Sequence, residues 1–235
     1  MNIDTFIEQL KLKGIELNDR QLDQFEKYYE LLVEWNKKMN LTNITNKEDV
    51  YLKHFYDSLT LSFFHPLSDQ HICDIGAGAG FPSIPLKIVY PNIKVTIVDS
   101  LNKRIIFLNK LIEELQLENV EAIASRAEEY ALDHREAFDI VSARAVARLN
   151  ILDELCLPLT KVSGYFITLK GAQGTLELEE CKQGISKLGG KVENIQAFTL
   201  PGHDDQRVNI YIKKISKTPT KYPRMFAKIK KSPLK

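Results

Sequence analysis

A glycine-rich turn preceded by a carboxylate is the feature of this sequence best suited to chemistry. The segment Asp74-Ile-Gly-Ala-Gly-Ala-Gly80 follows a short apolar run and leads into a second apolar stretch that reads as a helix. A strand, a glycine turn and a helix in this order form a nucleotide pocket. Glycine has no side chain, so a ligand can lie against the bare amides of the turn. The expected ligand contacts are Asp74, Gly76, Gly78, Gly80 and Phe81.

A second carboxylate, Asp99, ends the apolar run Lys94–Asp99. The next parallel strand of such a unit would bring Asp99 beside the glycine turn, where an acid can accept hydrogen bonds from a ribose diol. The glycine spacing is GxGxG, and Phe81 stands where dinucleotide folds need a small residue. The pattern therefore favours S-adenosylmethionine over NAD, although the glycines alone could form only a tight turn.

Two later stretches are expected at the same edge of the sheet. After an expected strand over residues 120–124, Ala127 and Glu128 would lie near an adenine ring, although Glu128 could equally be part of a solvated helix start. A strand from Phe138 runs directly into Arg144, and Arg148 follows. Open α/β folds bind ligands at the carboxyl ends of their strands, so these guanidinium groups could hold a phosphate or a base edge. The alternative is that both are ordinary solvated arginines.

The sequence also indicates the type of methyl acceptor. Transfer from a sulfonium chiefly requires alignment of donor and acceptor. Where amino-group methyltransferases of adenine or cytosine carry an Asn/Asp/Ser-Pro-Pro-aromatic box, this chain has Ser142-Ala-Arg-Ala. Methylation at carbon 5 of a pyrimidine needs a thiol, but Cys156 lies in an apolar stretch and is expected in the core. An acceptor with a free lone pair, such as guanine N7, fits best.

Composition limits the class of protein. At 235 residues with 44% hydrophobic content, the chain can form one sizeable core with a small appendage. Its three cysteines and five scattered histidines support neither a disulfide framework nor a metal site. The first residues lack a basic leader, and no stretch of about 18 apolar residues occurs. We expect a cytoplasmic protein, not bound to a membrane, that acts as a monomer.

The charge is unevenly distributed along the chain. Residues 213–235 hold nine Lys/Arg and no acids, which leaves 23 basic against 31 acidic residues elsewhere. Tyr222 and Phe226 lie among these cations, and basic residues beside aromatic ones suit phosphate and base contacts. We expect this tail to be ordered by docking, although a solubilising basic end is the alternative.

The remaining pattern predicts the elements that position these residues. Asn18 and Gln21 form a potential capping pair for an amphipathic helix, and a second helix follows the polar segment 40–46. From residue 70 strands alternate with helices, which predicts a parallel doubly wound sheet. Strands over 191–200 and 207–213 have no room for a helix between them and should pair antiparallel. The predicted fold is an α/β, Rossmann-like, seven-stranded class I S-adenosylmethionine-dependent methyltransferase, divided into a helical cap (1–68), a methyltransferase domain (69–214) and a basic tail (215–235).

Several motifs, spread over most of the chain, resemble one family in combination. They are Asn40-Leu-Thr, His54-Phe-Tyr-Asp-Ser-Leu59, residues 74–86, Asp99-Ser-Leu-Asn-Lys-Arg104, Arg126-Ala-Glu, Ala143-Arg-Ala-Val-Ala, Lys170-Gly171, Leu200-Pro and Tyr222-Pro-Arg. With these the chain resembles the RsmG family, also called GidB, of bacterial methyltransferases acting on guanine N7 of small-subunit (16S) ribosomal RNA. Ser83 departs from the family pattern, where glycine is expected.

The resemblance implies roles for individual residues. Gly76, Phe81, Ala127, Glu128 and Arg144 would contact the cofactor, with Asp99 on its ribose. His54 and Asp57 would close the pocket from the cap, although His54 by its chemistry alone could be a structural histidine. Arg144 and Lys170 would be the catalytic residues. The residues expected to face 16S RNA, free or within the small ribosomal subunit, are His54, Arg148, Lys170, Arg207 and Arg224.

Two other functions compete with this one. The charged tail and the lack of an acid–base group are also compatible with a non-catalytic RNA-binding or ribosome-assembly factor that keeps the pocket as a sensor. An NAD-dependent oxidoreductase is the third class, which Phe81 and the glycine spacing disfavour.

Overall fold

The computed structural model describes residues 1–234 and begins with two helices, α1 (Ile3–Lys11) and α2 (Asp19–Met39). The predicted capping pair of α2 is confirmed: the Gln21 amide donates to Oδ1 of Asn18, and the Asn18 amide donates to Oε1 of Gln21. The Gln21 side chain also donates to the carbonyl of Ile88, at 2.8 Å. This bond ties α2 to a helix that packs on the sheet.

The second predicted helix of the cap is not a regular α-helix. It consists of α3 (Lys47–Val50), a π-helical turn (Tyr51–Tyr56), the short α4 (Asp57–Leu59) and a 3₁₀ turn (Thr60–Phe63). The apolar side chains of this segment, Tyr51, Leu52, Phe55 and Leu59, are nevertheless buried, because the hydrophobic pattern specifies which residues face the core and leaves the local winding open. A π-helical turn often marks a functional site.

The sheet has seven strands, as predicted, and their order is β3-β2-β1-β4-β5-β7-β6. All neighbours pair in parallel except β7, which is antiparallel to both β5 and β6. The fifth strand has 12 residues, and its pairing with β4 shifts register between Phe138 and Ile140. The strands are β1 (His71–Ile75), β2 (Lys94–Asp99), β3 (Val120–Ala124), β4 (Phe138–Arg144), β5 (Thr160–Gly171), β6 (Gly190–Thr199) and β7 (Gln206–Lys214).

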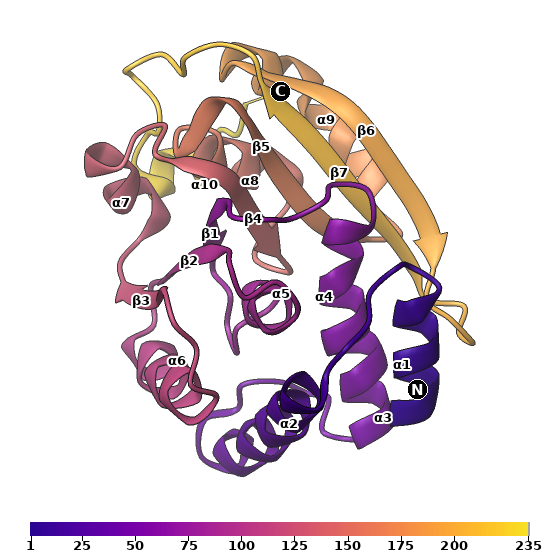
Figure 1. The fold of residues 1–235 in the computed structure, drawn as a ribbon. Coiled ribbons are helices and arrows are strands. Elements are labelled where there is room, and N and C mark those ends of the chain that lie inside the picture. Colours follow the sequence, from indigo (N-terminus) through magenta and orange to yellow (C-terminus); the bar gives the residue numbers. More distant parts are fainter. Residues whose placement is uncertain (235) are drawn as a thin grey trace.

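Helices cover both faces of the sheet, and each face has its own apolar cluster (Figure 1). The cap, α5 (Ser83–Val89) and α6 (Asn102–Glu114) lie on one face. The opposite face carries α7 (Ala127–Asp133), α8 (Leu149–Cys156), α9 (Gly174–Lys187) and α10 (Phe226–Lys231). Cys156 is fully buried in the second cluster, as predicted.

The order of the strands creates a crevice. The chain runs outward from β1 through β2 to β3, and then returns to place β4 on the other side of β1. Helices after β1 and β4 therefore leave the sheet in opposite directions, which opens a gap beyond the carboxyl ends of these two strands. The glycine turn, Asp99 and Arg144 all follow or end strands at this edge.

Candidate active site

The glycine turn connects β1 to α5 and uses backbone conformations that favour glycine. Gly78 has a φ of +61°, and a Cβ built there would meet no atom within 4 Å, so its backbone is open to the cavity. Gly80 has a φ of +102°, and a Cβ there would lie 2.7 Å from Ile84 and 2.8 Å from the hydroxyl of Tyr28. Gly78 thus allows a ligand to approach, whereas Gly80 allows the cap to pack.

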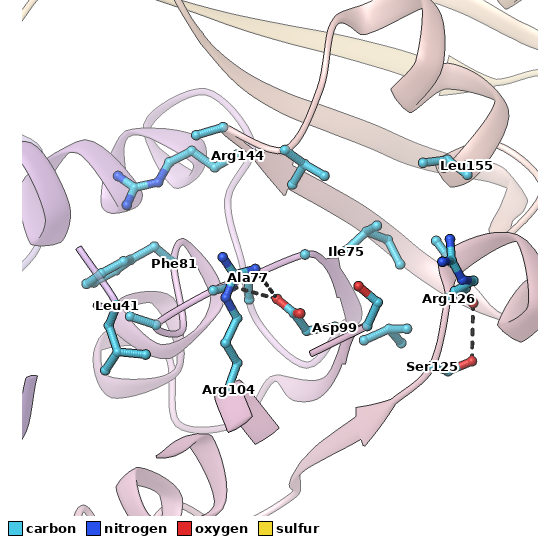
Figure 2. Close-up of a pocket in the computed structure, with 18 of the residues that line it drawn as sticks. Leu41, Ile75, Ala77, Phe81, Asp99, Arg104, Ser125, Arg126, Arg144 and Leu155 are labelled. Atoms are coloured by element: carbon cyan, nitrogen blue, oxygen red, sulfur yellow. Dashed lines mark hydrogen bonds and ion pairs between the residues drawn. The ribbon is translucent and has the colours of Figure 1, made fainter. Parts of the chain in front are cut away.

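Asp99 lies at the centre of a cavity of about 430 Å³ (Figure 2). Its Oδ1 accepts the amide of Leu101 at 2.9 Å, and its Oδ2 accepts the amide of Gly78 at 3.2 Å and Nη1 of Arg104 at 3.0 Å. The carboxylate is 2% exposed. These donors fix its orientation next to the glycine turn, where the sequence placed it.

The two ends of the cavity differ in chemistry. Figure 2 shows Leu41, Phe81 and Arg144 at one end and Arg126 with Leu155 at the other, with Asp99 between them. The second end is formed by the start of α7, by α8 and by Phe226, which opens α10. The apolar Leu155 and the aromatic Phe226 in its wall suit a flat heterocycle. The residues at this end are Ser125, Arg126, Ala127, Glu128, Leu155 and Phe226.

The first end is organised around Arg144. Its guanidinium lies 4.8 Å from the ring centroid of Phe81, on which the His54 ring stacks at 4.4 Å. Arg144 donates to the carbonyl of Lys53 at 3.1 Å, to Oδ2 of Asp57 at 3.2 Å and to Nδ1 of His54 at 3.2 Å. All three acceptors belong to the π-helical turn or to the residue after it, so this turn assembles the site.

His54 is neutral in this arrangement. Burial, reinforced by the positive charge of Arg144, lowers its pKa to about 3. Its Nδ1 accepts the bond from Arg144, because arginine cannot act as an acceptor. The imidazole therefore carries its proton on Nε2.

A second cavity of about 340 Å³ adjoins the first and shares His54, Arg144 and Ala145 with it. Lys170, nearly buried there, pairs with Glu177 at 2.7 Å and donates to the carbonyl of Ala147 at 2.8 Å. Nε of Arg207 donates to both carboxylate oxygens of Asp57, each at 3.2 Å. The cations and carboxylates that line this second cavity are thus held in ion pairs.

Three predicted site residues are engaged in packing or hydrogen bonds outside the linings of the two cavities. Asp74 is fully buried behind the cavity wall, where its Oδ2 accepts the amide of Ser83 at 3.1 Å, and burial raises its pKa to about 7. Gly80 also lies outside the lining and serves packing. Arg224, expected to face RNA, instead donates from Nε to the buried Glu154 at 2.8 Å. It anchors the tail to α8.

The other predicted residues lie at one of the two cavities or at the surface. Arg148 is at the surface, paired with Glu180. The first cavity is lined by Gly76, Gly78, Phe81, Asp99, Ala127, Glu128, Arg144 and His54, and the second by His54, Asp57, Arg144, Lys170 and Arg207.

Sequence reasoning missed several lining residues, namely Leu41, Thr42, Arg104, Leu155, Val146 and Phe226. Leu41, Thr42, Arg104 and Val146 lay within motifs that the sequence singled out, and Phe226 within the aromatic, basic tail. No signal in the sequence placed Phe226 at this cavity, because only the folded chain brings α10 beside α7 and α8.

The crevice position, the glycine turn and the central carboxylate are those of a class I, Rossmann-like methyltransferase, and solved structures agree on this fold. A SAM-dependent methyltransferase from Aquifex aeolicus is similar with a TM-score of 0.56 and 16% identity, over 74% of this chain and 96% of that one. TYW2 of M. jannaschii, solved in complex with AdoMet, is similar with a TM-score of 0.55 and 16% identity, over 69% and 76% of the two chains.

Sequence comparison identifies the family. The family model described as GidB, rRNA small subunit methyltransferase G, matches residues 21–208. Proteins named ribosomal RNA small subunit methyltransferase G are 56% identical in Staphylococcus carnosus and 55% identical in Bacillus subtilis, over 100% of this chain and 99% of each relative. This chain belongs to the rRNA small subunit methyltransferase G family.

Residues 1–234 contain neither a membrane-spanning helix nor a cluster of metal-binding side chains. None of the helices within residues 1–234 combines the length and apolar composition needed to cross a bilayer. The same residues contain no group of three or more His, Cys, Asp or Glu side chains placed to hold a metal ion.

Proposed function

We propose that this protein transfers a methyl group from S-adenosylmethionine to N7 of a guanine in small-subunit (16S) ribosomal RNA. Two adjoining cavities that share Arg144 and His54 carry the proposal, since one would hold the methyl donor and the other the acceptor base. The names of the relatives support the RNA substrate.

The larger cavity suits S-adenosylmethionine in size and in chemistry. A volume of about 430 Å³ is in the usual range of small-molecule sites. Asp99 would accept hydrogen bonds from the ribose hydroxyls, and the open backbone at Gly78 allows close approach. The aromatic end with Leu155 and Phe226 would take the adenine ring. When bound, the cofactor supplies an activated methyl group on a sulfonium.

The acceptor cavity supports an acceptor that loses no proton. The carboxylates that line it, Asp57 and Glu177, are paired with cations. His54 has a low pKa, and its Nδ1 already accepts a hydrogen bond from Arg144. None of these groups is poised as a general base. Guanine N7 has a free lone pair, so positioning is sufficient. The cations Lys170 and Arg207 would hold the nucleotide, and Arg144 would orient it next to the cofactor cavity.

The test is methylation of small ribosomal subunits, or of 16S RNA, purified from cells that lack this protein. With tritiated S-adenosylmethionine, we expect label in 7-methylguanosine after digestion to nucleosides and mass spectrometry. Label in another nucleoside would refute the N7 assignment. RNA binding without any transfer would instead support the non-catalytic RNA-binding factor.

The substitution Asp99→Asn is the matched variant for the cofactor site. It keeps the shape of the side chain and removes its charge, so we expect the Kd for S-adenosylmethionine to rise by about tenfold or more. Isothermal titration calorimetry measures this directly. Because the substitution leaves the methyl-transfer step itself unchanged, raising the concentration of S-adenosylmethionine should restore much of the activity. An unchanged Kd would contradict the ribose assignment.

A further inference from the structure

The loop between α2 and α3 contributes a hydroxyl to the cofactor cavity. Thr42 and Leu41 line the cavity at the end that contains Phe81 and Arg144. The loop is fixed there, because the Thr42 amide donates to Oδ1 of Asn36 at 2.8 Å. Thr42 is partly buried and its hydroxyl belongs to a defined chain of hydrogen bonds.

The direction of every bond in that chain follows from its first member. Arg144 can only donate, so Nδ1 of His54 accepts and Nε2 carries the proton. That Nε2–H donates to Oγ1 of Thr42 at 2.8 Å. The amide of Ile44 donates to the same oxygen at 3.0 Å. Both lone pairs of the hydroxyl are therefore used, and its own proton is left to donate to another acceptor.

The position of Thr42 in the cavity indicates which group of the bound ligand would accept the hydroxyl proton in a hydrogen bond. With the ribose at Asp99 and the adenine at the Phe226 end, the amino-acid end of the cofactor would reach the end with Thr42 and Arg144. That end of the ligand carries an ammonium and a carboxylate. A hydroxyl whose lone pairs are occupied cannot accept from the ammonium, but it can donate to the carboxylate.

We propose that the Thr42 hydroxyl binds the carboxylate of the methyl donor and that His54 and Arg144 orient its proton. The inference rests on the proposed function, because it requires an S-adenosyl ligand. It gives the neutral His54 a role in the donor cavity, as the link through which Arg144 sets the direction of the Thr42 hydroxyl.

The test compares two ligands and two variants by calorimetry. S-adenosylhomocysteine carries the carboxylate, whereas S-adenosyl-3-thiopropylamine keeps the amine and lacks it. Thr42→Val preserves shape and removes the hydroxyl, while Thr42→Ser retains the hydroxyl. We expect Thr42→Val to weaken S-adenosylhomocysteine binding by about tenfold or more and to change the affinity for the amine by less than about twofold. Thr42→Ser should retain most of the wild-type preference for S-adenosylhomocysteine over the amine.

The outcomes separate this inference from the proposed function. If the wild-type protein binds neither ligand, the S-adenosyl site itself is refuted. If the wild-type protein binds S-adenosylhomocysteine and Thr42→Val weakens both ligands equally, or neither, the hydroxyl does not bind the carboxylate. Thermal unfolding of both variants detects a general loss of structure, which would lower the affinity for both ligands together.

Discussion

Asp153 and Glu154 are consecutive carboxylates of α8, both fully buried, in contrasting environments. Glu154 accepts hydrogen bonds from Nε and Nη2 of Arg224. Oδ2 of Asp153, by contrast, has no hydrogen-bond partner within the described chain. Burial raises the pKa of Asp153 from its ordinary value of 3.8 to about 8. At neutral pH one carboxylate is therefore paired and the other is protonated.

The protonated state of Asp153 makes stability depend on pH. Between about pH 4 and pH 8 the folded protein keeps this proton while the unfolded chain releases it, so the contribution of Asp153 to stability falls as pH rises. Asp153→Asn lacks this dependence. We expect the Tm of the variant minus that of the wild type to increase from pH 5 to pH 8 in thermal unfolding.

A second variant controls for the change of carboxylate to amide. Asp133→Asn alters an exposed residue at the end of α7, and its Tm difference from the wild type should stay nearly constant over the same pH range. A constant difference for Asp153→Asn as well would show that this carboxyl is ionised in the folded protein.

At the level of elements, the C-terminal segment forms part of the wall of the larger cavity. Tyr222 and Ile229 are buried against the second core cluster, and Arg224 pairs with Glu154. This docking places Phe226, at the start of α10, in the cavity wall, with the Arg126 guanidinium 6.0 Å from its ring centroid. The basic tail thus reaches the adenine end of the proposed cofactor site.

Phe226→Ala tests this contribution. Removing an aromatic contact to the ligand should weaken S-adenosylhomocysteine binding by about two- to tenfold. The neighbouring Met225 is 79% exposed and lies outside the cavity lining, so Met225→Ala should bind the ligand as the wild type does. Equal affinities of the two variants in calorimetry would place the adenine elsewhere.

The sequence predicted the helices and strands better than it predicted the side-chain contacts between residues far apart in the chain. Alternating strands and helices, together with the short connection between residues 200 and 206, were sufficient for the seven-stranded sheet and its antiparallel end. Asp99 was predictable because strand order determines where its carboxylate emerges. The pairing of Arg224 with the buried Glu154 was not predictable, since the two residues are 70 positions apart and nothing in the local pattern links them. The π-helical turn was also missed, because apolar spacing does not resolve it.

At the level of the whole molecule, charge is separated between an acidic body and a basic C-terminal segment. Lys228, Lys230 and Lys231 are exposed on α10, the helix whose first residue lines the larger cavity. A cationic surface beside the cavity would attract the phosphates of RNA and bring the acceptor base to it. The tail would then serve both cofactor and RNA, the former through Phe226 and the latter through these lysines.

Replacing Lys228, Lys230 and Lys231 with glutamine should weaken RNA binding and make it less sensitive to salt. Each lost phosphate contact reduces the magnitude of the negative slope of log K against log salt by roughly 0.7 to 0.9, so the loss of three contacts would reduce it by about two. Fluorescence anisotropy over a salt series measures the slope. The triple variant Lys182, Lys187 and Lys191 to glutamine removes the same charge from α9 and the start of β6 and should leave the slope nearly unchanged.

The π-helical turn at Tyr51–Tyr56 has a consequence for the evolution of the cap. Its wider winding lets the Lys53 carbonyl, His54 and Asp57 all reach one guanidinium. Deleting a single residue would restore ordinary winding, in which these three groups would no longer all face the same guanidinium. Insertions and deletions should therefore be selected against in this stretch, even where amino-acid replacements are accepted. Homologues should differ there in amino-acid sequence but not in the number of residues.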